Sequence, residues 1–203
     1  MSTLILCLIL LLTSYLGAQP TLEEFAAKLK PMAEHTTIQA DYTQTRHFQE
    51  LDFDMVVKGK LAQEQGARLA WTTTDPVHSV CIFTKDSFRF WDEESKKTTS
   101  LNAAKFPWIK LIFQMQSNWM TGDLKALEKV FQLKIEDATT LRLTPLDATV
   151  KQFFQEIVIV FREDFSCVSQ VVFTEKTGDA ITILFQNVLY DKKISPEVWR
   201  TGF

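Results

Sequence analysis

Apolar and polar residues alternate over much of this chain. From Ile38 to Thr43 every second residue is apolar, which is the period of a strand with one buried face. The same period recurs in short segments that are separated by turn residues such as Gln65-Gly66, Asp75-Pro76 and Lys85-Asp86. These segments lie at 38–43, 55–61, 69–71, 80–82, 88–90, 131–135, 141–144, 153–161, 168–174 and 181–187. Their short connections predict antiparallel neighbours.

Three segments depart from the strand period. Thr21 and Glu24 form a capping-box pattern, and apolar residues then recur at helical spacing until Pro31, so we expect an amphipathic helix there. Residues 106–115 are apolar almost all round and precede the polar residues 116–118. They predict a short apolar helix or loop. Residues 123–130 predict one more brief helix.

The fold class that follows is mainly β (α+β). So many strands with so few helices predict an antiparallel sheet that closes, or nearly closes, into a barrel. Several strands are apolar on both faces, and 12% of the residues are aromatic. Most of these side chains fit a plain core with helices packed on the outer face. The apolar connector at 106–115 fits that interpretation less well, because connections are usually polar; it suggests a lid over an apolar cavity.

The N-terminus has the pattern of an export signal. An uncharged apolar run from Leu4 to Leu12 precedes Gly17-Ala18, a site of small residues, which is typical of a cleaved signal peptide at residues 1–18. The run is too short for a membrane-spanning helix. Residues 19–203 have the size of a single domain. After cleavage Cys81 and Cys167 remain, either as a disulfide or as two buried free thiols.

No pattern of catalytic or metal-binding residues is evident. The histidines His35, His47 and His78 lie on separate segments without ligand spacing, so no metal site is expected. There is no Gly-x-Ser-x-Gly elbow and no phosphate-binding glycine loop. Carboxylate clusters at 52–54, 92–94 and 163–164 lie at expected turns, where solvated charge is ordinary. A net charge of −3 gives no reason to expect nucleic acid as a partner. We therefore predict no catalysis and no cofactor.

Two stretches carry a pattern seen in a known family. The first stretch is Tyr42-Thr43-Gln44-Thr45-Arg46. The second begins with Gly59-Lys60-Leu61 and continues, after a short turn, through Leu69-Ala70-Trp71 to Asp75-Pro76. In order and spacing this series resembles the LolA family, the periplasmic carriers of outer-membrane lipoproteins. The resemblance extends from about Thr21 to the end of the chain. It implies an incompletely closed antiparallel barrel with a helical lid, whose concave face shelters acyl chains.

The resemblance implies that Leu69 and Trp71 point into the cavity and that Ile109, Ile112 and Phe113 belong to the lid; the apolar positions of the other predicted strands and helices complete each set. The expected lipid-binding residues are Tyr42, Val57, Leu69, Trp71, Val80, Ile82, Phe88, Phe90, Ile157, Ile159, Phe173 and Ile183. The expected lid residues are Leu22, Phe25, Leu29, Trp108, Ile109, Ile112, Phe113 and Met115. Lipoprotein carriers place an Arg in the turn before the Leu-x-Trp strand, where it bonds the lid closed. Here that turn reads Gln65-Gly66 and the nearest candidate is Arg68.

By this resemblance the protein is a monomeric periplasmic carrier without a cofactor. An inner-membrane ABC transporter would donate the lipoprotein, and an outer-membrane acceptor would receive it. The missing turn Arg leaves the cargo open between a lipoprotein and another lipid or lipid-linked product. A lipid-processing enzyme and an envelope scaffold protein remain as alternatives.

Overall fold

The computed structural model describes residues 20–201, apart from the side chains of residues 107 and 108. Its strands form one antiparallel sheet in the order β6-β5-β4-β3-β2-β1-β11-β10-β9-β8-β7. The strands are β1 (Thr37–Phe48), β2 (Phe53–Glu64), β3 (Arg68–Asp75), β4 (Ser79–Thr84), β5 (Ser87–Asp92), β6 (Thr98–Asn102), β7 (Phe131–Ile135), β8 (Thr140–Pro145), β9 (Phe154–Phe161), β10 (Val168–Glu175) and β11 (Ala180–Tyr190).

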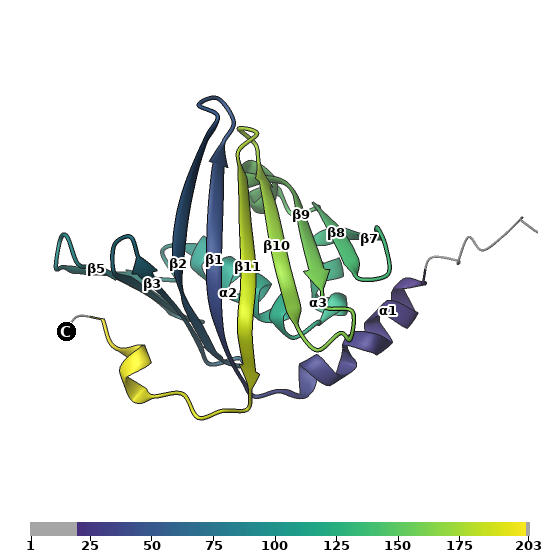
Figure 1. Ribbon diagram of the computed structural model, residues 1–203, viewed down its shortest axis with the longest axis horizontal. Coiled ribbons are helices and arrows are strands. Elements are labelled where there is room, and N and C mark those ends of the chain that lie inside the picture. Colours follow the sequence, from purple (N-terminus) through teal and green to yellow (C-terminus); the bar gives the residue numbers. More distant parts are fainter. Residues whose placement is uncertain (1–19, 202–203) are drawn as a thin grey trace, which may run out of the picture.

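The first and last strands meet at the centre of the sheet. β1 pairs with β11 from Ile38 opposite Tyr190 to His47 opposite Ala180. Each half of the chain therefore forms a meander on its own side of this seam (Figure 1). β6 and β7 are the two edges and do not pair with each other. The prediction of an incompletely closed antiparallel sheet is confirmed, whereas full closure into a barrel does not occur.

The helices precede, connect or follow the strands along the chain. They are α1 (Leu22–Leu29), α2 (Pro107–Met120), α3 (Leu124–Glu128) and α4 (Ala148–Phe153), with two 3₁₀ turns, η1 (Lys30–Glu34) and η2 (Pro196–Trp199). The predicted capping box of α1 is present, because Thr21 Oγ1 accepts from the Glu24 backbone N–H at 3.2 Å and Glu24 Oε2 accepts from the Thr21 N–H at 2.8 Å.

The apolar connector is a helix and is longer than its apolar run. α2 starts at Pro107 and continues through the polar residues 116–118 to Met120. Proline suits the first turn of a helix because the amide there needs no intrahelical partner. Gly122 follows with φ +67°, a conformation that favours glycine. In Figure 1, α2 crosses the face of the sheet that is turned away from the viewer.

Two elements differ from the predictions. Phe153, expected to begin a strand, ends the short helix α4, and β9 begins one residue later. Asp147 caps α4 by accepting hydrogen bonds from the backbone N–H groups of Thr149 and Val150. This cap stabilises the helix up to Phe153, although the apolar run there predicts a strand. β6 was not predicted, because its residues, apart from Leu101, are polar and exposed and show no alternation.

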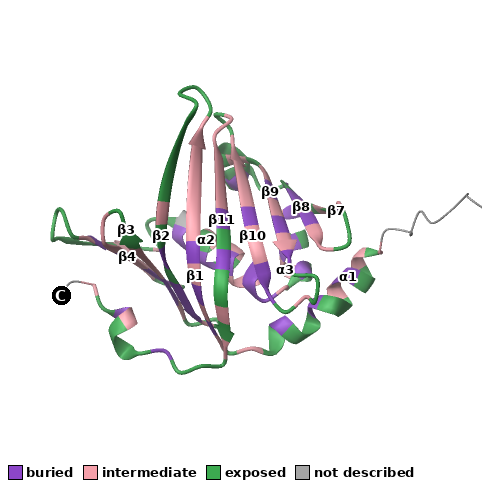
Figure 2. Ribbon diagram, viewed as in Figure 1, coloured by how far each residue is buried: buried purple, intermediate pink, exposed green. Residues whose placement is uncertain are grey.

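Buried residues occur along most of the strands (Figure 2), and they form two clusters, one on each face of the sheet. The main cluster lies on the concave face, where α1, α2 and α3 pack on the strands. A second cluster lies on the opposite, convex face of β2 to β5, beneath the C-terminal segment that contains Ile194 and Trp199. The sheet therefore has apolar cover on each side, as its doubly apolar strands require.

Cys81 and Cys167 are free thiols. Cys81 lies on β4 and Cys167 precedes β10, and four strands separate β4 from β10 in the sheet. At about 4.8 Å per strand step, the two sulfurs are far beyond disulfide reach. The disulfide alternative is therefore excluded.

The predicted signal peptide at residues 1–18 lies outside the described residues. Within residues 20–201, no helix is long and apolar enough to cross a membrane.

Candidate functional site

Most of the expected lipid-binding residues lie on the concave face. Cross-strand pairs place them on one wall: Tyr42 is opposite Phe185, and Trp71 is opposite Leu61 and Cys81. The residues that belong to the main cluster or pack against it are Tyr42, Val57, Leu69, Trp71, Phe88, Ile157, Ile159, Phe173 and Ile183. Phe90 shares this face because it pairs with Cys81. Lipid binding by these residues stays a prediction.

Val80 and Ile82 lie on the other face of the sheet. Both belong to the convex cluster, together with Trp91 and Trp199. Their placement in the cavity was wrong, because β4 is apolar on both faces and alternation alone does not say which set faces inward.

The lid residues differ in how they contact the sheet. Phe25, Leu29, Ile109 and Phe113 are fully buried in the main cluster. Leu22 and Met115 pack against it while half-buried. Ile112 is 38% exposed and does not belong to the cluster. The side chain of Trp108 lies outside the described part of the chain.

Two side-chain hydrogen bonds join α2 to the concave wall. Trp71 Nε1 on β3 donates to Gln116 Oε1 at 3.1 Å, and Gln63 Nε2 on β2 donates to Ser117 Oγ at 3.2 Å. Gln63 is 1% and Gln116 is 5% exposed, so both amides are removed from water. Gln63 Oε1 and Gln116 Nε2 have no hydrogen-bond partner. We call Trp71, Gln63, Gln116 and Ser117 the latch.

Sequence reasoning missed the latch residues other than Trp71. The signal was present, because Gln63 continues the inward series of Gly59 and Leu61, and a polar triplet interrupts an otherwise apolar helix. The expected gating residues lie elsewhere. Arg68 donates to both carboxylate oxygens of Glu64 at 2.8 Å and lies 4.1 Å over the Trp199 ring, on the convex side. Gln65 is exposed in the neighbouring turn.

An open apolar pocket adjoins the lid. It has a volume of about 310 Å³ and lies between α2 and α4, lined by Leu111, Ile112, Met115, Val150, Phe153 and Phe154. Phe153 is 55% exposed at its edge. Deeper under the lid, a void of about 10 Å³ lies between Trp119, Phe131 and Ile159. The lid side chains thus fill the inner concave face and leave an apolar hollow beside it.

A second groove, of about 390 Å³, lies on the convex face beneath η2. Charged side chains line it, including Asp41, Lys60, Glu197 and Arg200. Asp41 accepts hydrogen bonds from Asn187 and Lys60 at 2.7 and 2.8 Å, and both hold its pKa below the usual value, Asn187 most strongly. Such walls suit an acyl chain less well than the pocket beside α2.

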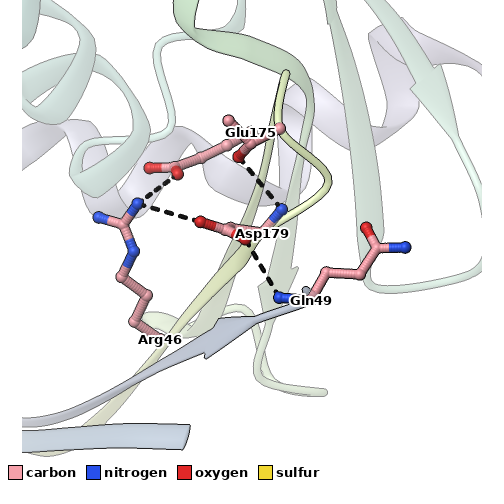
Figure 3. A network of polar contacts seen from close by, with 5 residues as sticks. Arg46, Gln49, Glu175 and Asp179 are labelled. Carbon is pink, nitrogen blue, oxygen red and sulfur yellow. Dashed lines mark hydrogen bonds and ion pairs between the residues drawn. The ribbon is translucent and has the colours of Figure 1, made fainter. Parts of the chain in front are cut away.

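An ion cluster lies where β1 meets the β10–β11 turn (Figure 3). Arg46 donates to Glu175 at 2.5 Å and to Asp179 at 3.4 Å, and Asp179 also accepts from the backbone N–H of Gln49 at 3.1 Å. Arg46 is paired with Met55 and Ile181, so it lies on the concave side. The cluster ties the long β1–β2 hairpin to its neighbours beyond the lid.

Burial alters the acidity of groups beneath the lid. It raises the pKa of the Cys81 thiol to about 11 and also raises the pKa of Tyr42, whose hydroxyl lies 3.0 Å from Thr73 Oγ1. Cys81 is therefore a protonated, unreactive thiol at neutral pH while the lid is closed.

The carboxylates at turns serve local structure. The backbone N–H and then the hydroxyl of Ser95 lower the pKa of Asp92. The hydroxyl and then the backbone N–H of Ser166 lower the pKa of Asp164. An acid catalyst near neutral pH would need a raised pKa instead. Among the described residues, no group of three histidines, cysteines or carboxylates is placed to hold a metal.

Comparison with known proteins places the chain in a family. Residues 33–201 match the family model described as outer membrane lipoprotein carrier protein LolA. This chain belongs to the LolA family. The match spans both meanders and the lid, and it confirms the resemblance found in the sequence. No curated protein matches the chain.

The chain is also similar to solved structures at low sequence identity. An uncharacterized conserved protein from Thermus thermophilus has 8% identity and a TM-score of 0.53, with 89% of this chain and 94% of that chain covered. A LolA superfamily protein from Nitrosomonas europaea has 9% identity and a TM-score of 0.47, with 87% and 97% covered. A putative outer membrane lipoprotein-sorting protein domain from Vibrio parahaemolyticus has 11% identity and a TM-score of 0.44, with 86% and 94% covered.

Proposed function

We propose that this LolA-family protein carries a lipid-modified cargo, sheltering an acyl chain against the concave wall after α2 swings away. The observation that supports this most directly is the lid itself. An apolar wall is covered by a helix that two side-chain hydrogen bonds join to the sheet, with an apolar pocket open at the edge of that helix.

The closed lid also accounts for how such a carrier could release its cargo. Each CH₂ group removed from water contributes about 0.8 kcal/mol, so a sixteen-carbon chain would gain about 12 kcal/mol if fully buried. That corresponds to nanomolar binding or tighter for one chain. Exposing Ile109 and Phe113 on lid opening costs about 1.5–3 kcal/mol each. The lid therefore offsets part of the gain and keeps binding reversible.

On the family resemblance, the cargo is an outer-membrane lipoprotein or another acylated product, moved through the periplasm without catalysis. The donor would be an inner-membrane ABC transporter and the acceptor an outer-membrane protein. Native mass spectrometry of the protein purified from its own cells tests the cargo, because a bound lipid or acylated peptide adds its mass.

Two substitutions on α2, each of which introduces a carboxylate, test whether the acyl chain occupies this pocket. Ile112 lines the pocket while 38% exposed, so Ile112→Asp sets a carboxylate in the pocket without burying it in the core. Gln114 is exposed on the same helix and outside this pocket, so Gln114→Asp is the matched control. We expect Ile112→Asp to weaken binding of a fluorescent fatty acid at least tenfold and the control to leave it unchanged. Equal binding by both variants would mean that the acyl chain does not use this pocket.

A further inference from the structure

The latch has a polarity that points to a chemical feature of the cargo. On the sheet side, Trp71 Nε1 and Gln63 Nε2 are both hydrogen-bond donors. On the lid side, Gln116 Oε1 and Ser117 Oγ are both oxygen acceptors. Because Trp has only a donor, the direction of the Trp71–Gln116 bond is fixed. The lid thus presents two oxygens to two donors in the concave wall.

When α2 leaves, those donors lose their partners within an apolar surface. Gln63 is 1% exposed, and its neighbours on the same face are Leu61 and Leu69. A buried donor without an acceptor opposes binding. A pure hydrocarbon chain offers no acceptor, whereas the carbonyl at the head of an acyl chain does.

We propose, resting on the carrier function above, that Trp71 and Gln63 form a subsite for the acyl carbonyl group of the cargo. In the closed state Gln116 and Ser117 occupy it with their own oxygens. The unpaired Gln63 Oε1 and Gln116 Nε2 add a further observation. Both belong to side chains more than nine-tenths buried, and the lid leaves the acceptor on Gln63 unfilled. An ester carbonyl engages the two donors, and an amide can also donate its N–H to Gln63 Oε1.

The test is competition binding on the full chain, with dodecylpyrene as the fluorescent probe. The competitors are methyl dodecanoate, dodecanamide and tridecane, which separate ester, amide and hydrocarbon. The measured quantity is the ratio of alkane to ester (or amide) dissociation constants. Comparing this ratio between protein variants cancels the different solubilities of the competitors.

We expect the double variant Trp71→Phe with Gln63→Leu to lower that ratio by about fivefold to thirtyfold, the effect of one to two ordinary hydrogen bonds. Trp71→Phe alone keeps a ring against Tyr42, whose ring centroid lies 4.7 Å away. This milder variant should lower the ratio about fivefold and serves if the double variant fails to fold. Trp199→Phe is the matched control, because Trp199 Nε1 is also buried without a hydrogen-bond partner but its side chain lies in the convex cluster, on the other face of the sheet. It should leave the ratio unchanged.

The outcomes separate the subsite from the carrier function. If the probes bind but the ratio is the same in all variants, the carbonyl subsite is refuted and the carrier function stands. If dodecylpyrene and all three competitors fail to bind the unmutated protein, the carrier function is refuted, and the subsite with it. A larger effect of the variants on dodecanamide than on methyl dodecanoate would identify an amide-linked chain as the preferred cargo.

Discussion

Opening of the lid can be followed by the reactivity of one native thiol. Cys81 lies opposite Trp71 on the concave wall, and α2 packs on its strand. Cys81 is half-buried and burial raises its pKa to about 11, so labelling by a thiol reagent at neutral pH is slow while the lid is closed and accelerates when the lid moves. Phe113 is 5% exposed in the cluster that holds α2 down. We therefore predict that Phe113→Ala accelerates labelling of Cys81.

The magnitude follows from the packing that Phe113 loses. Truncating a buried Phe to Ala costs about 3–5 kcal/mol, and each 1.4 kcal/mol changes an equilibrium tenfold. If closure of the lid bears this loss, its open population and the labelling rate of Cys81 rise by roughly a hundredfold to a few thousandfold. Ile112→Ala is the control, because it truncates a 38% exposed side chain at the adjacent position of the same helix. It should change the labelling rate of Cys81 by less than about threefold.

Cys167 supplies an internal control. It is 2% exposed and belongs to the opposite half of the sheet. Peptide mapping by mass spectrometry follows both thiols in one sample. Selective labelling of Cys81 indicates local opening of the lid, whereas equal acceleration at both thiols indicates global unfolding. If Phe113→Ala labels Cys81 no faster than Ile112→Ala does, the view of α2 as a separately opening lid is wrong.

Two further predictions concern stability. A Cβ at Gly59 would lie 2.0 Å from the Thr72 carbonyl oxygen, so Gly59→Ala should lower the free energy of unfolding by about 1–3 kcal/mol in urea titration; an unchanged midpoint would contradict the close approach. A hydrogen bond with His35, and to a smaller extent one from the Thr36 backbone N–H, lowers the pKa of Asp191 to about 2. Its contribution to stability is therefore present above the ordinary Asp pKa and is lost as the pH falls towards 2. Asp191→Asn should flatten the dependence of unfolding midpoints on pH between 5 and 2, and an equally steep dependence would exclude this role.

The sequence predicted the wall of the site better than its polar centre. Strands with one apolar face, such as the segment that holds Ile38 and Tyr42, could be oriented because only one register buries the apolar set. For β4 the two registers are equally apolar, so Val80 and Ile82 were assigned to the wrong face. What decides the face is the C-terminal Trp199, more than a hundred residues away, and alternation within a strand carries no information about it.

The short elements depended on capping signals that strand patterns obscured. Asp147 caps α4, and Ser195 caps η2 by accepting from the Glu197 backbone N–H at 3.4 Å. Both are visible in the sequence as helix-start residues. The latch was harder to predict, because pairing Gln63 with Ser117 requires knowing that α2 folds back over β2. That contact is set by tertiary packing and not by any local pattern.

The central seam has a consequence for how the polypeptide is made. Ile38 pairs with Tyr190 and Asp41 with Gln186, so the middle of the sheet joins residues about 150 positions apart along the chain. The ribosome must therefore have synthesised the chain as far as β11 before β1 meets its partner, and such distant pairing is slow to form. A nascent chain whose central strand β1 stays unpaired on one side until β11 emerges is suited to export in an unfolded state. If the first 18 residues do direct export, the strand order itself helps to keep the protein competent for translocation.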